Sequence, residues 1–240
     1  MLVAAGMAAG AGIMAYGAAT LTSHKLAMSS GPEPVTVFLS RDGGRITGGI
    51  DDARRRESSS LANQGLGSVD LAAFSGSDKA WDALVACVEQ RYDGYDVTFV
   101  TEAPARGEYV LAMIGGPPSQ LRLADNVGGL APHNGSVISD AVVFVFQTPA
   151  SSVSDLCQTT AHEVGHAVGL DHTRLCSDVM SYESCGPKRF RDAYARCGEW
   201  DARDCDLGGA HQNSDAILAS AVGRRGLTDS VAGLRLGGGS

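Results

Sequence analysis

One eleven-residue segment, residues 162–172, constrains this sequence more than any other feature. It reads His-Glu-Val-Gly-His-Ala-Val-Gly-Leu-Asp-His, and the apolar pattern from Ser154 through Leu170 predicts a helix that carries most of it. Residues four apart on a helix are separated by only about 40° around the axis, so His162 and His166 project from one face. Two imidazoles on one rigid element can bind the same metal ion.

Gly169 indicates how a third ligand reaches that ion. Glycine adopts the left-handed conformation at little cost, so a helix capped by Ser154 or Asp155 can end there and the chain can turn sharply. His172 then approaches the ion from another direction. Three neutral imidazoles leave a zinc ion its full double charge, which lowers the pKa of a bound water toward about 7, and Glu163 is placed to accept the proton.

Chance and an ordinary structural role are the competing explanations of this segment. A lone His-Glu-x-x-His can arise by chance, but a glycine and a third histidine at fixed offsets lower the expectation to roughly 10⁻⁵ or less per chain of this length. A helix whose histidines only make unrelated hydrogen bonds is disfavoured by the same spacing. We therefore expect a catalytic zinc site made by His162, His166 and His172, with Glu163 as general base and acid.

The segment resembles the zinc-binding consensus of the metzincin clan of zinc metallopeptidases at every fixed position. Residues 178–182, Asp-Val-Met-Ser-Tyr, are similar to the Met-turn of that clan. The resemblance implies that Met180 forms a hydrophobic floor under the three histidines. It also implies that the phenol of Tyr182 approaches the zinc ion or the reaction oxyanion, as in astacins, serralysins and pappalysin-like proteins, of which the last are the most similar.

Both downstream residues have simpler interpretations when the resemblance is set aside. A lone methionine such as Met180 usually fills a core, and a buried tyrosine bonded to backbone is the alternative for Tyr182. A phenol aimed at a developing oxyanion would nevertheless be a suitable donor. Thr173 follows the third histidine, where the better-known families have residues of their own, so the resemblance leaves the subfamily open.

Upstream of the motif, the apolar patterns predict a sheet and one further helix. A helical spacing of apolar residues after the cap Ser77 indicates a core-facing helix that ends near Tyr92. The glycine-rich segment 127–132 fits either an edge strand or an ordinary loop. The strands predicted from runs of β-favouring residues are 35–39, 97–101, 109–114 and 141–146.

This order of elements agrees with the fold that the metzincin resemblance implies. That fold is α+β or α/β: a five-stranded mixed twisted sheet with an antiparallel edge strand, two main helices and an irregular, disulfide-containing C-terminal lobe. The lobe should end in a helix that begins at Asn213 and Ser214 and runs to Ala221. In such a fold the edge strand pairs with the backbone of an extended substrate. Its residues here would be Gly128, Gly129, Leu130 and Ala131.

The stretch from residue 47 to residue 68 is rich in Gly, Ser, Asp and Arg, and it predicts a solvated loop. A processing site at its three consecutive arginines, residues 54–56, is the alternative. Asp51 and Asp52 are candidates for a structural calcium site, although two acids in a polar loop are ordinarily just solvated. The remaining histidines are given surface or capping roles. They are His24, His133 and His211.

The composition is that of one acidic domain. With 240 residues, 44% of them hydrophobic, the chain can bury one well-packed core, which we place at residues 34–223. Residues 34–171 would form an upper subdomain and residues 172–223 a lower one, followed by a flexible tail at 224–240. A formal net charge of -8 argues against a nucleic-acid partner, because such proteins usually carry a basic face.

Residues 1–23 contain no charged side chain and are rich in Ala, Gly and Met. A secretory signal cleaved just after Ala19 is one interpretation, although the usual basic n-region is missing. A weakly hydrophobic membrane anchor is the other. Both predict a secreted or cell-envelope protein, with membrane contact only through this segment if it is retained.

The chain contains six cysteines, and an even number suggests disulfide bonds in an exported protein. A structural zinc site made of cysteines is the alternative, but no Cys-x-x-Cys pair is present. Many connectivities are possible, and proximity in sequence favours one of them. Its pairs are Cys176 with Cys185, Cys197 with Cys205, and Cys87 with Cys157.

Together these features predict a zinc-dependent endopeptidase that acts on peptide or protein substrates. Glu163 would take a proton from a zinc-bound water and pass it to the leaving amine, while zinc and Tyr182 share the charge of the oxyanion. Two other classes stay open. A non-catalytic, zinc-stabilised peptide-binding module would not need Glu163, and a small-molecule amidohydrolase would not need the edge strand.

Overall fold

A five-stranded sheet forms the centre of the structure, a computed structural model that describes residues 32–183 and 185–226. The strand order is β5-β1-β6-β8-β7, with β7 antiparallel to β8 and the other neighbours parallel. The strands are β1 (Val35–Ser40), β5 (Val97–Val100), β6 (Val110–Ile114), β7 (Gly129–Leu130) and β8 (Val142–Val145). The four predicted strands are confirmed, and the glycine-rich segment forms the antiparallel edge strand rather than an ordinary loop.

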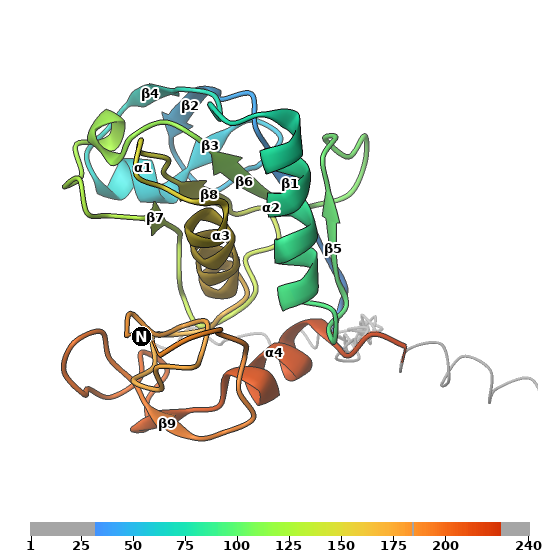
Figure 1. The fold of residues 1–240 in the computed structure, drawn as a ribbon, viewed down its shortest axis with the longest axis vertical. Coiled ribbons are helices and arrows are strands. Elements are labelled where there is room, and N and C mark those ends of the chain that lie inside the picture. Colours follow the sequence, from blue (N-terminus) through green and yellow to red (C-terminus); the bar gives the residue numbers. More distant parts are fainter. Residues whose placement is uncertain (1–31, 184, 227–240) are drawn as a thin grey trace, which may run out of the picture. The chain divides into compact units, whose positions relative to one another are not determined.

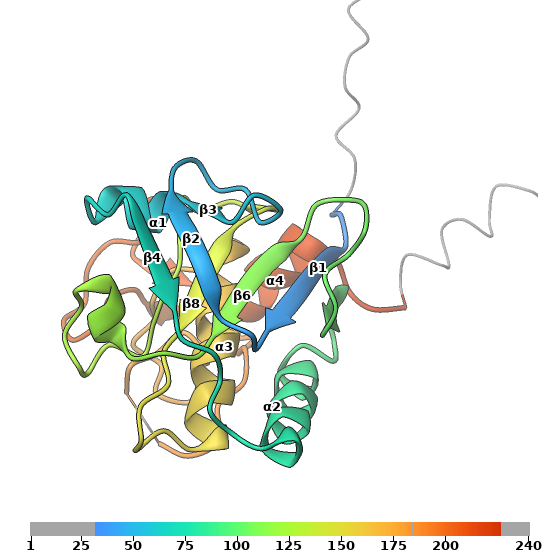
Figure 2. The same ribbon diagram turned by 90° about the horizontal axis from the view of Figure 1, so that it is seen from above.

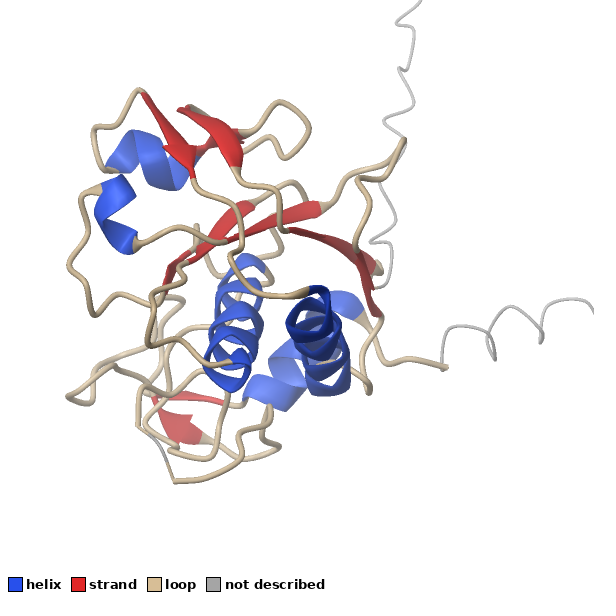
Figure 3. Ribbon diagram, turned by 45° about the horizontal axis from the view of Figure 1, so that its top comes forward, coloured by secondary structure: helices blue, strands red, loops and turns tan. Residues whose placement is uncertain are grey.

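Two helices, α2 (Asp78–Arg91) and α3 (Val153–Ala167), pack on one face of this sheet (Figure 3). Ser77 begins α2 as predicted, because its hydroxyl accepts a hydrogen bond from the backbone N–H of Ala80 at 3.2 Å. The sequence-based cap of α3 is wrong. Ser152 caps it, with its Oγ accepting from the N–H of Asp155 while the Asp155 carboxylate accepts from the N–H of Ser152.

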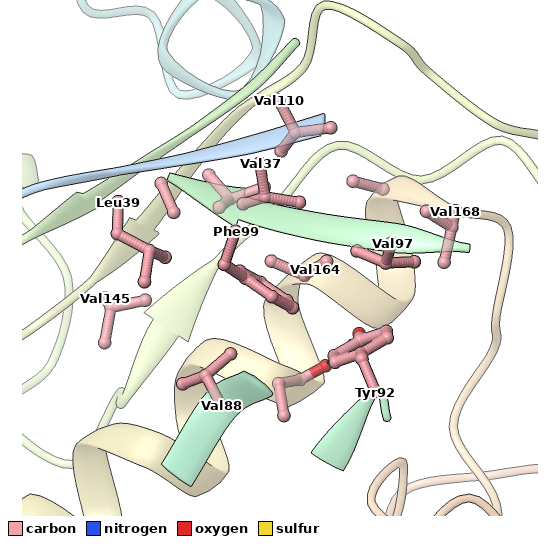
Figure 4. Packing of buried hydrophobic residues seen from close by; sticks show 14 of the residues in the cluster. Val37, Leu39, Val88, Tyr92, Val97, Phe99, Val110, Val145, Val164 and Val168 are labelled. Atoms are coloured by element: carbon pink, nitrogen blue, oxygen red, sulfur yellow. The ribbon is translucent and has the colours of Figure 1, made fainter. Parts of the chain in front are cut away.

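The main hydrophobic core lies between the sheet and these helices (Figure 4). Val37 and Val145 from the sheet meet Val88 from α2 and Val164 from α3, and all four are fully buried. Tyr92, at the C-terminal end of α2, is also fully buried, and its hydroxyl donates to the backbone carbonyl of Ala161 in α3 at 2.8 Å. Because the strands are covered on both faces, their sequences are apolar almost throughout rather than alternating.

The opposite face of the sheet is covered by the segment that was predicted to be a solvated loop, so that prediction is wrong. A second sheet, of order β3-β2-β4, forms there together with a short helix and a 3-10 turn (Figure 2). Its few apolar side chains, such as Ile46 and Leu61, are fully buried against Phe144 and Met113. The elements are β2 (Gly44–Gly48), β3 (Glu57–Ser58), α1 (Ser59–Asn63), β4 (Ser68–Leu71) and η1 (Pro118–Leu121).

The two acidic residues considered for calcium lie at this second sheet. The carboxylate of Asp51 accepts hydrogen bonds from the amide and hydroxyl of Ser59. The carboxylate of Asp52 accepts from the amide of Arg55 at 3.0 Å and also lies near its guanidinium. Both carboxylates therefore have protein donors as partners.

After α3 the chain forms a largely irregular lobe below the sheet (Figure 1). The lobe contains β9 (Ala195–Arg196) paired with β10 (His211–Gln212), and it ends in α4 (Ser214–Val222). Asn213 caps α4 through a 2.9 Å bond from the N–H of Ala216, which confirms the predicted helix start.

All three predicted disulfides are confirmed. Cys87–Cys157 joins α2 to α3, while Cys176–Cys185 and Cys197–Cys205 each close a short loop in the lower lobe. None of the helices in the described ranges is long and apolar enough to cross a membrane. The predicted signal or anchor at residues 1–23, His24, and most of the predicted tail at residues 224–240 lie outside the described residues.

Candidate metal centre

Helix α3 carries His162, Glu163 and His166 and ends at Ala167, before the predicted end at Leu170, with the predicted turn at Gly169. The N–H of Gly169 bonds to the carbonyl of His166, and the N–H of Leu170 bonds to the carbonyl of Gly165, each at 3.0 Å. This pair of bonds is a Schellman motif, which requires a left-handed residue after the cap, and Gly169 has φ of 96°. A side chain there would also approach the backbone of Gly135 to 3.0 Å. The turn directs the following residues back toward the helix.

The structure brings His162, His166 and His172 together. Their Nε2 atoms form a nearly equilateral triangle with sides of 3.1 Å (His162 to His166), 3.0 Å (His166 to His172) and 3.1 Å (His162 to His172). Two of the rings come from one face of α3, and the third arrives from the chain beyond Gly169. Each histidine thus offers the same ring nitrogen to one point.

The other nitrogen of each ring faces an oxygen acceptor. His162 Nδ1 lies 3.0 Å from the carbonyl of Val179, and His166 Nδ1 lies 2.8 Å from the carbonyl of Leu170. A carbonyl oxygen can only accept, so Nδ1 donates and Nε2 keeps its lone pair. For His172, Nδ1 lies 2.7 Å from a carboxylate oxygen of Glu199, so here too Nδ1 donates and Nε2 keeps its lone pair.

Electrostatics favour the neutral rings. Burial, together with the neighbouring His172, lowers the pKa of His162 to about 3. Burial is also the main reason why the pKa values of His166 and His172 are lowered, although the Glu199 carboxylate opposes the change at His172. Three neutral imidazoles therefore direct three lone pairs at one another, an arrangement that repels unless a cation lies between them.

These residues fit a zinc ion. A tetrahedral ion with Zn–N distances of about 2.0–2.1 Å separates its ligand nitrogens by about 3.3 Å. The observed Nε2 separations of 3.0–3.1 Å agree with this to within about 0.3 Å. Borderline imidazole nitrogens suit zinc better than magnesium or calcium, which prefer oxygen ligands. The other nearby acids that could be ligands, Asp171 and Glu199, are instead held by Arg203.

Glu163 has a carboxylate with no fixed partner. Among the residues that the structure describes, no hydrogen bond or ion pair involves this side chain, although it is only 7% exposed. Burial raises the pKa of Glu163 to about 8. The group is therefore held next to the histidines while both of its oxygens stay free for a ligand or a water.

The edge strand β7 passes directly over this glutamate. A Cβ atom added to Gly129 would lie 2.5 Å from Cγ and Oε1 of Glu163, closer than real atoms approach. At Gly128 the nearest atom to an added Cβ would be Oγ1 of Thr159, at 3.3 Å. Gly129 is thus the residue that leaves room for Glu163, a role that the glycine pattern alone did not identify.

Met180 lies in a tight turn beneath α3 and is fully buried. A Cβ on Gly165 would come within 2.5 Å of its sulfur, so Met180 packs against the helix between the two histidines of α3. The turn is fixed by Asp178, whose carboxylate accepts from the N–H of Met180 at 2.9 Å. Val179, in the same turn, supplies the carbonyl that orients His162.

Tyr182 lies at the open side of the triad and is 46% exposed. Its ring centroid is 4.6 Å from that of His172 and 5.6 Å from that of His162. Trp200, itself exposed, packs on the outer face of Tyr182 at 5.5 Å. Burial and the nearby Glu163 and Glu199 carboxylates raise the pKa of Tyr182, so the phenol keeps its proton and remains a donor.

Two site residues were missed from the sequence, Glu199 and Arg203. Glu199 faces His172, and the guanidinium of Arg203 contacts both Glu199 and Asp171. No local motif predicts them, because they lie about 30 residues beyond the histidine segment in an irregular loop.

The other described histidines lie outside the triad. The ring of His133 stands 5.5 Å from that of His166, and its Nδ1 lies 3.3 Å from a carboxylate oxygen of Asp206. His211 is exposed on β10. Neither belongs to the group of histidines that converge.

Solved structures that are similar to this chain include the three that follow. No protein-family model matches the sequence, and neither does any curated protein. The hatching enzyme zinc-protease HCE-1 from the medaka fish Oryzias latipes is 10% identical, with a TM-score of 0.25, and the match covers 43% of this chain and 44% of that one. Metalloproteinase-II from Bacteroides fragilis is 12% identical, with a TM-score of 0.34, over 67% of this chain and 50% of that one.

Myroilysin is 17% identical, with a TM-score of 0.23, and the match covers 41% of this chain and 46% of that one. In each case the match spans half or less of the similar protein's own chain. Zinc metalloproteases are thus among the solved structures to which the chain is similar, as the resemblance of its motif predicted.

Proposed function

We propose that the protein is a zinc-dependent endopeptidase. One observation carries the proposal: three neutral imidazoles direct their Nε2 lone pairs at one point, with separations of 3.0–3.1 Å, beside the unpartnered carboxylate of Glu163. Three protein ligands and a free carboxylate are the elements of a hydrolytic zinc site, since the fourth position stays open for water or substrate. His162, His166 and His172 would hold the ion.

When bound, zinc supplies Lewis acidity and lowers the pKa of water toward about 7. Glu163 accepts a proton from the attacking water and then donates it to the nitrogen of the leaving amine. Its side chain lies against Gly129 and is not among the ligand atoms that converge. The raised pKa of the buried carboxyl suits a group that must hold a proton between these two transfers.

Tyr182 and β7 would contribute to substrate binding and to transition-state stabilisation. The protonated phenol, beside His172, can donate a hydrogen bond to the oxygen on which negative charge develops. The edge strand from Gly128 to Ala131 can pair with an extended peptide by strand addition. Met180 supports the helix from below. The substrate is accordingly a peptide or protein, and no nucleic-acid partner is proposed.

We propose that residues 34–223 form one catalytic domain, with residues 34–171 as its upper and 172–223 as its lower subdomain. Three disulfides are consistent with an oxidising compartment, so we propose a secreted or cell-envelope protein whose residues 1–23 direct export or anchor it.

The test uses Glu163→Gln, which removes the proton carrier and nearly conserves its shape. The variant should retain zinc in an amount equal to wild type, while its cleavage of a peptide library falls by about three orders of magnitude or more. Glu89→Gln makes the same charge change on the exposed side of α2 and should cleave like wild type. Zinc content is measured by elemental analysis of the folded, disulfide-bonded protein.

Two results would contradict the proposal. A wild type that holds zinc but cleaves no peptide would favour a zinc-stabilised binding module. Cleavage whose efficiency does not increase from short to long peptides would favour a small-molecule amidohydrolase, because an extended strand site gains contacts with each added residue.

A further inference from the structure

The loop closed by Cys197–Cys205 reaches the metal centre through three of its residues. Glu199 faces His172, Trp200 packs on Tyr182, and Arg203 bonds to Asp171, the residue just before His172. The backbone carbonyl of Trp200 also accepts a hydrogen bond from Arg174, which follows the motif by two positions. One short loop thus contacts two side chains of the site, His172 through Glu199 and Tyr182 through Trp200.

His172 differs from the other two histidines in how its proton is fixed. The rings of His162 and His166 are held by α3 and donate to neutral backbone carbonyls. His172 lies beyond the end of the helix and donates to a carboxylate, at 2.7 Å from Nδ1 to Oε1 of Glu199. A carboxylate makes a stronger bond than a carbonyl and increases the electron density that the imidazole offers through Nε2.

The Glu199 carboxylate is itself held in place. Arg203 donates from Nη2 to its Oε1 at 2.8 Å and from Nε to its Oε2 at 3.3 Å. The same guanidinium donates to both oxygens of Asp171, at 2.6 Å and 2.8 Å. Asp171 in turn accepts from the backbone N–H of His172 at 2.6 Å. The network therefore fixes both the backbone and the ring of the third histidine.

We propose that Glu199 is a positioning residue that orients His172 for metal binding, with Arg203 and the Cys197–Cys205 loop holding Glu199. This inference rests on the zinc site of the proposed function. The two carboxylates near His172 do not form a second cation site, because Arg203 supplies a positive charge between them. Glu199 acts only through the histidine and does not contact the ion itself.

The first experiment measures zinc affinity by competition with a chromophoric chelator. Glu199→Ala removes the acceptor and should weaken zinc binding by about 10- to 100-fold, whereas Glu199→Gln keeps a neutral acceptor and should lose less. Asp201→Asn is the matched control, because it makes a like charge change in the same loop and its side chain has no hydrogen bond or ion pair among the described residues. It should bind zinc like wild type.

A second experiment separates positioning from a general effect on the lobe. In a His172→Ala background there is no ring for Glu199 to orient, so adding Glu199→Ala should leave zinc affinity unchanged. The absorption spectrum of the Co²⁺-substituted protein should shift in Glu199→Ala and not in Asp201→Asn, since only the former alters a ligand.

Three outcomes would overturn the inference. The first is a Glu199→Ala protein that binds zinc as tightly as wild type. The second is an equal loss of affinity with and without His172, which would mean that Glu199 only stabilises the loop. In either case the wild type still binds zinc, and the proposed function stands. A folded wild type that binds no zinc is the third outcome, and it would overturn the proposed function as well.

Discussion

At the residue scale, each imidazole of the centre depends on a second group that fixes its proton. The sequence was enough to predict that the three histidines converge, with Glu163 beside them. All four residues lie within eleven positions, and helical geometry together with the turn at one glycine determines where they point. The acceptors could not be predicted. Two are backbone carbonyls created by the turn after α3 and by the Met180 turn, and the third, Glu199, comes from a loop with no periodic pattern.

Tyr182 allows a prediction at this scale. Tyr182→Phe removes the phenolic donor but keeps the ring that packs against His172. If the hydroxyl stabilises the oxyanion, kcat should fall by roughly 100-fold while KM stays near its wild-type value, because the interaction exists only in the transition state. Steady-state kinetics on a peptide identified from the library provide the measurement.

The control for that variant is Tyr194→Phe, which removes a hydroxyl from an exposed tyrosine of the same lobe. It should leave both constants unchanged. A Tyr182→Phe enzyme with wild-type kcat would show that the phenol takes no part in the reaction.

At the element scale, the start of α3 shows where sequence reasoning failed. Serines at residues 151, 152 and 154 all lie at or near the start of the helix, and the apolar pattern does not distinguish among them as the cap. Ser152 is the cap because Asp155 lies three residues after it, and the two residues form a reciprocal pair of hydrogen bonds. That arrangement is a capping box, with Asp in place of the usual Glu or Gln.

Capping of α3 can be tested by urea unfolding of the zinc-free protein. Ser152→Ala should lower the free energy of unfolding by about 1 kcal/mol at neutral pH, whereas Ser154→Ala should change it little. Hydrogen bonds from the side chain and backbone of Ser152 lower the pKa of Asp155. This stabilisation is therefore fully present above the unfolded pKa of about 3.9 and is lost as the pH falls through the lower folded value.

The difference between wild type and Ser152→Ala should accordingly narrow in acid. Equal losses for the two serine variants, or a difference that widens below a pH of about 4, would argue against this cap.

The edge strand gives a second prediction at this scale. Gly129→Ala should displace the Glu163 side chain, because the new Cβ would lie 2.5 Å from its Cγ and Oε1. A misplacement of about 1 Å in a catalytic group can cost roughly 100-fold in rate, so kcat/KM should fall by about that factor while zinc content is unchanged.

Gly128→Ala is the matched control, since its Cβ would meet Thr159 rather than Glu163. Both variants keep the backbone donors and acceptors with which a peptide could pair. Similar losses in the two would mean that any side chain on the strand blocks the substrate, and that crowding of Glu163 is not the cause.

At the scale of the whole molecule, the parts with regular patterns were predicted and the polar parts were not. Proximity in sequence identified the disulfides because two pairs close loops with separations of 8 and 9 residues, which left only Cys87 and Cys157. The second sheet was missed because its chain is mostly Gly, Ser, Asp and Arg. Its few apolar residues include Ile46, Leu61 and Leu71. They are too widely spaced to form a strand or helix pattern in the sequence, and their burial becomes evident only when they pack against the far face of the central sheet.

The central claim is that three imidazoles converge on one zinc ion. X-ray absorption at the zinc edge, combined with elemental analysis of the folded, disulfide-bonded protein, tests it most directly. One zinc ion per chain with three imidazole nitrogens at about 2.0–2.1 Å and no sulfur ligand is the predicted result, since all six cysteines are in disulfides. Folded protein that holds no zinc, or zinc bound without His162, His166 and His172, would contradict the account.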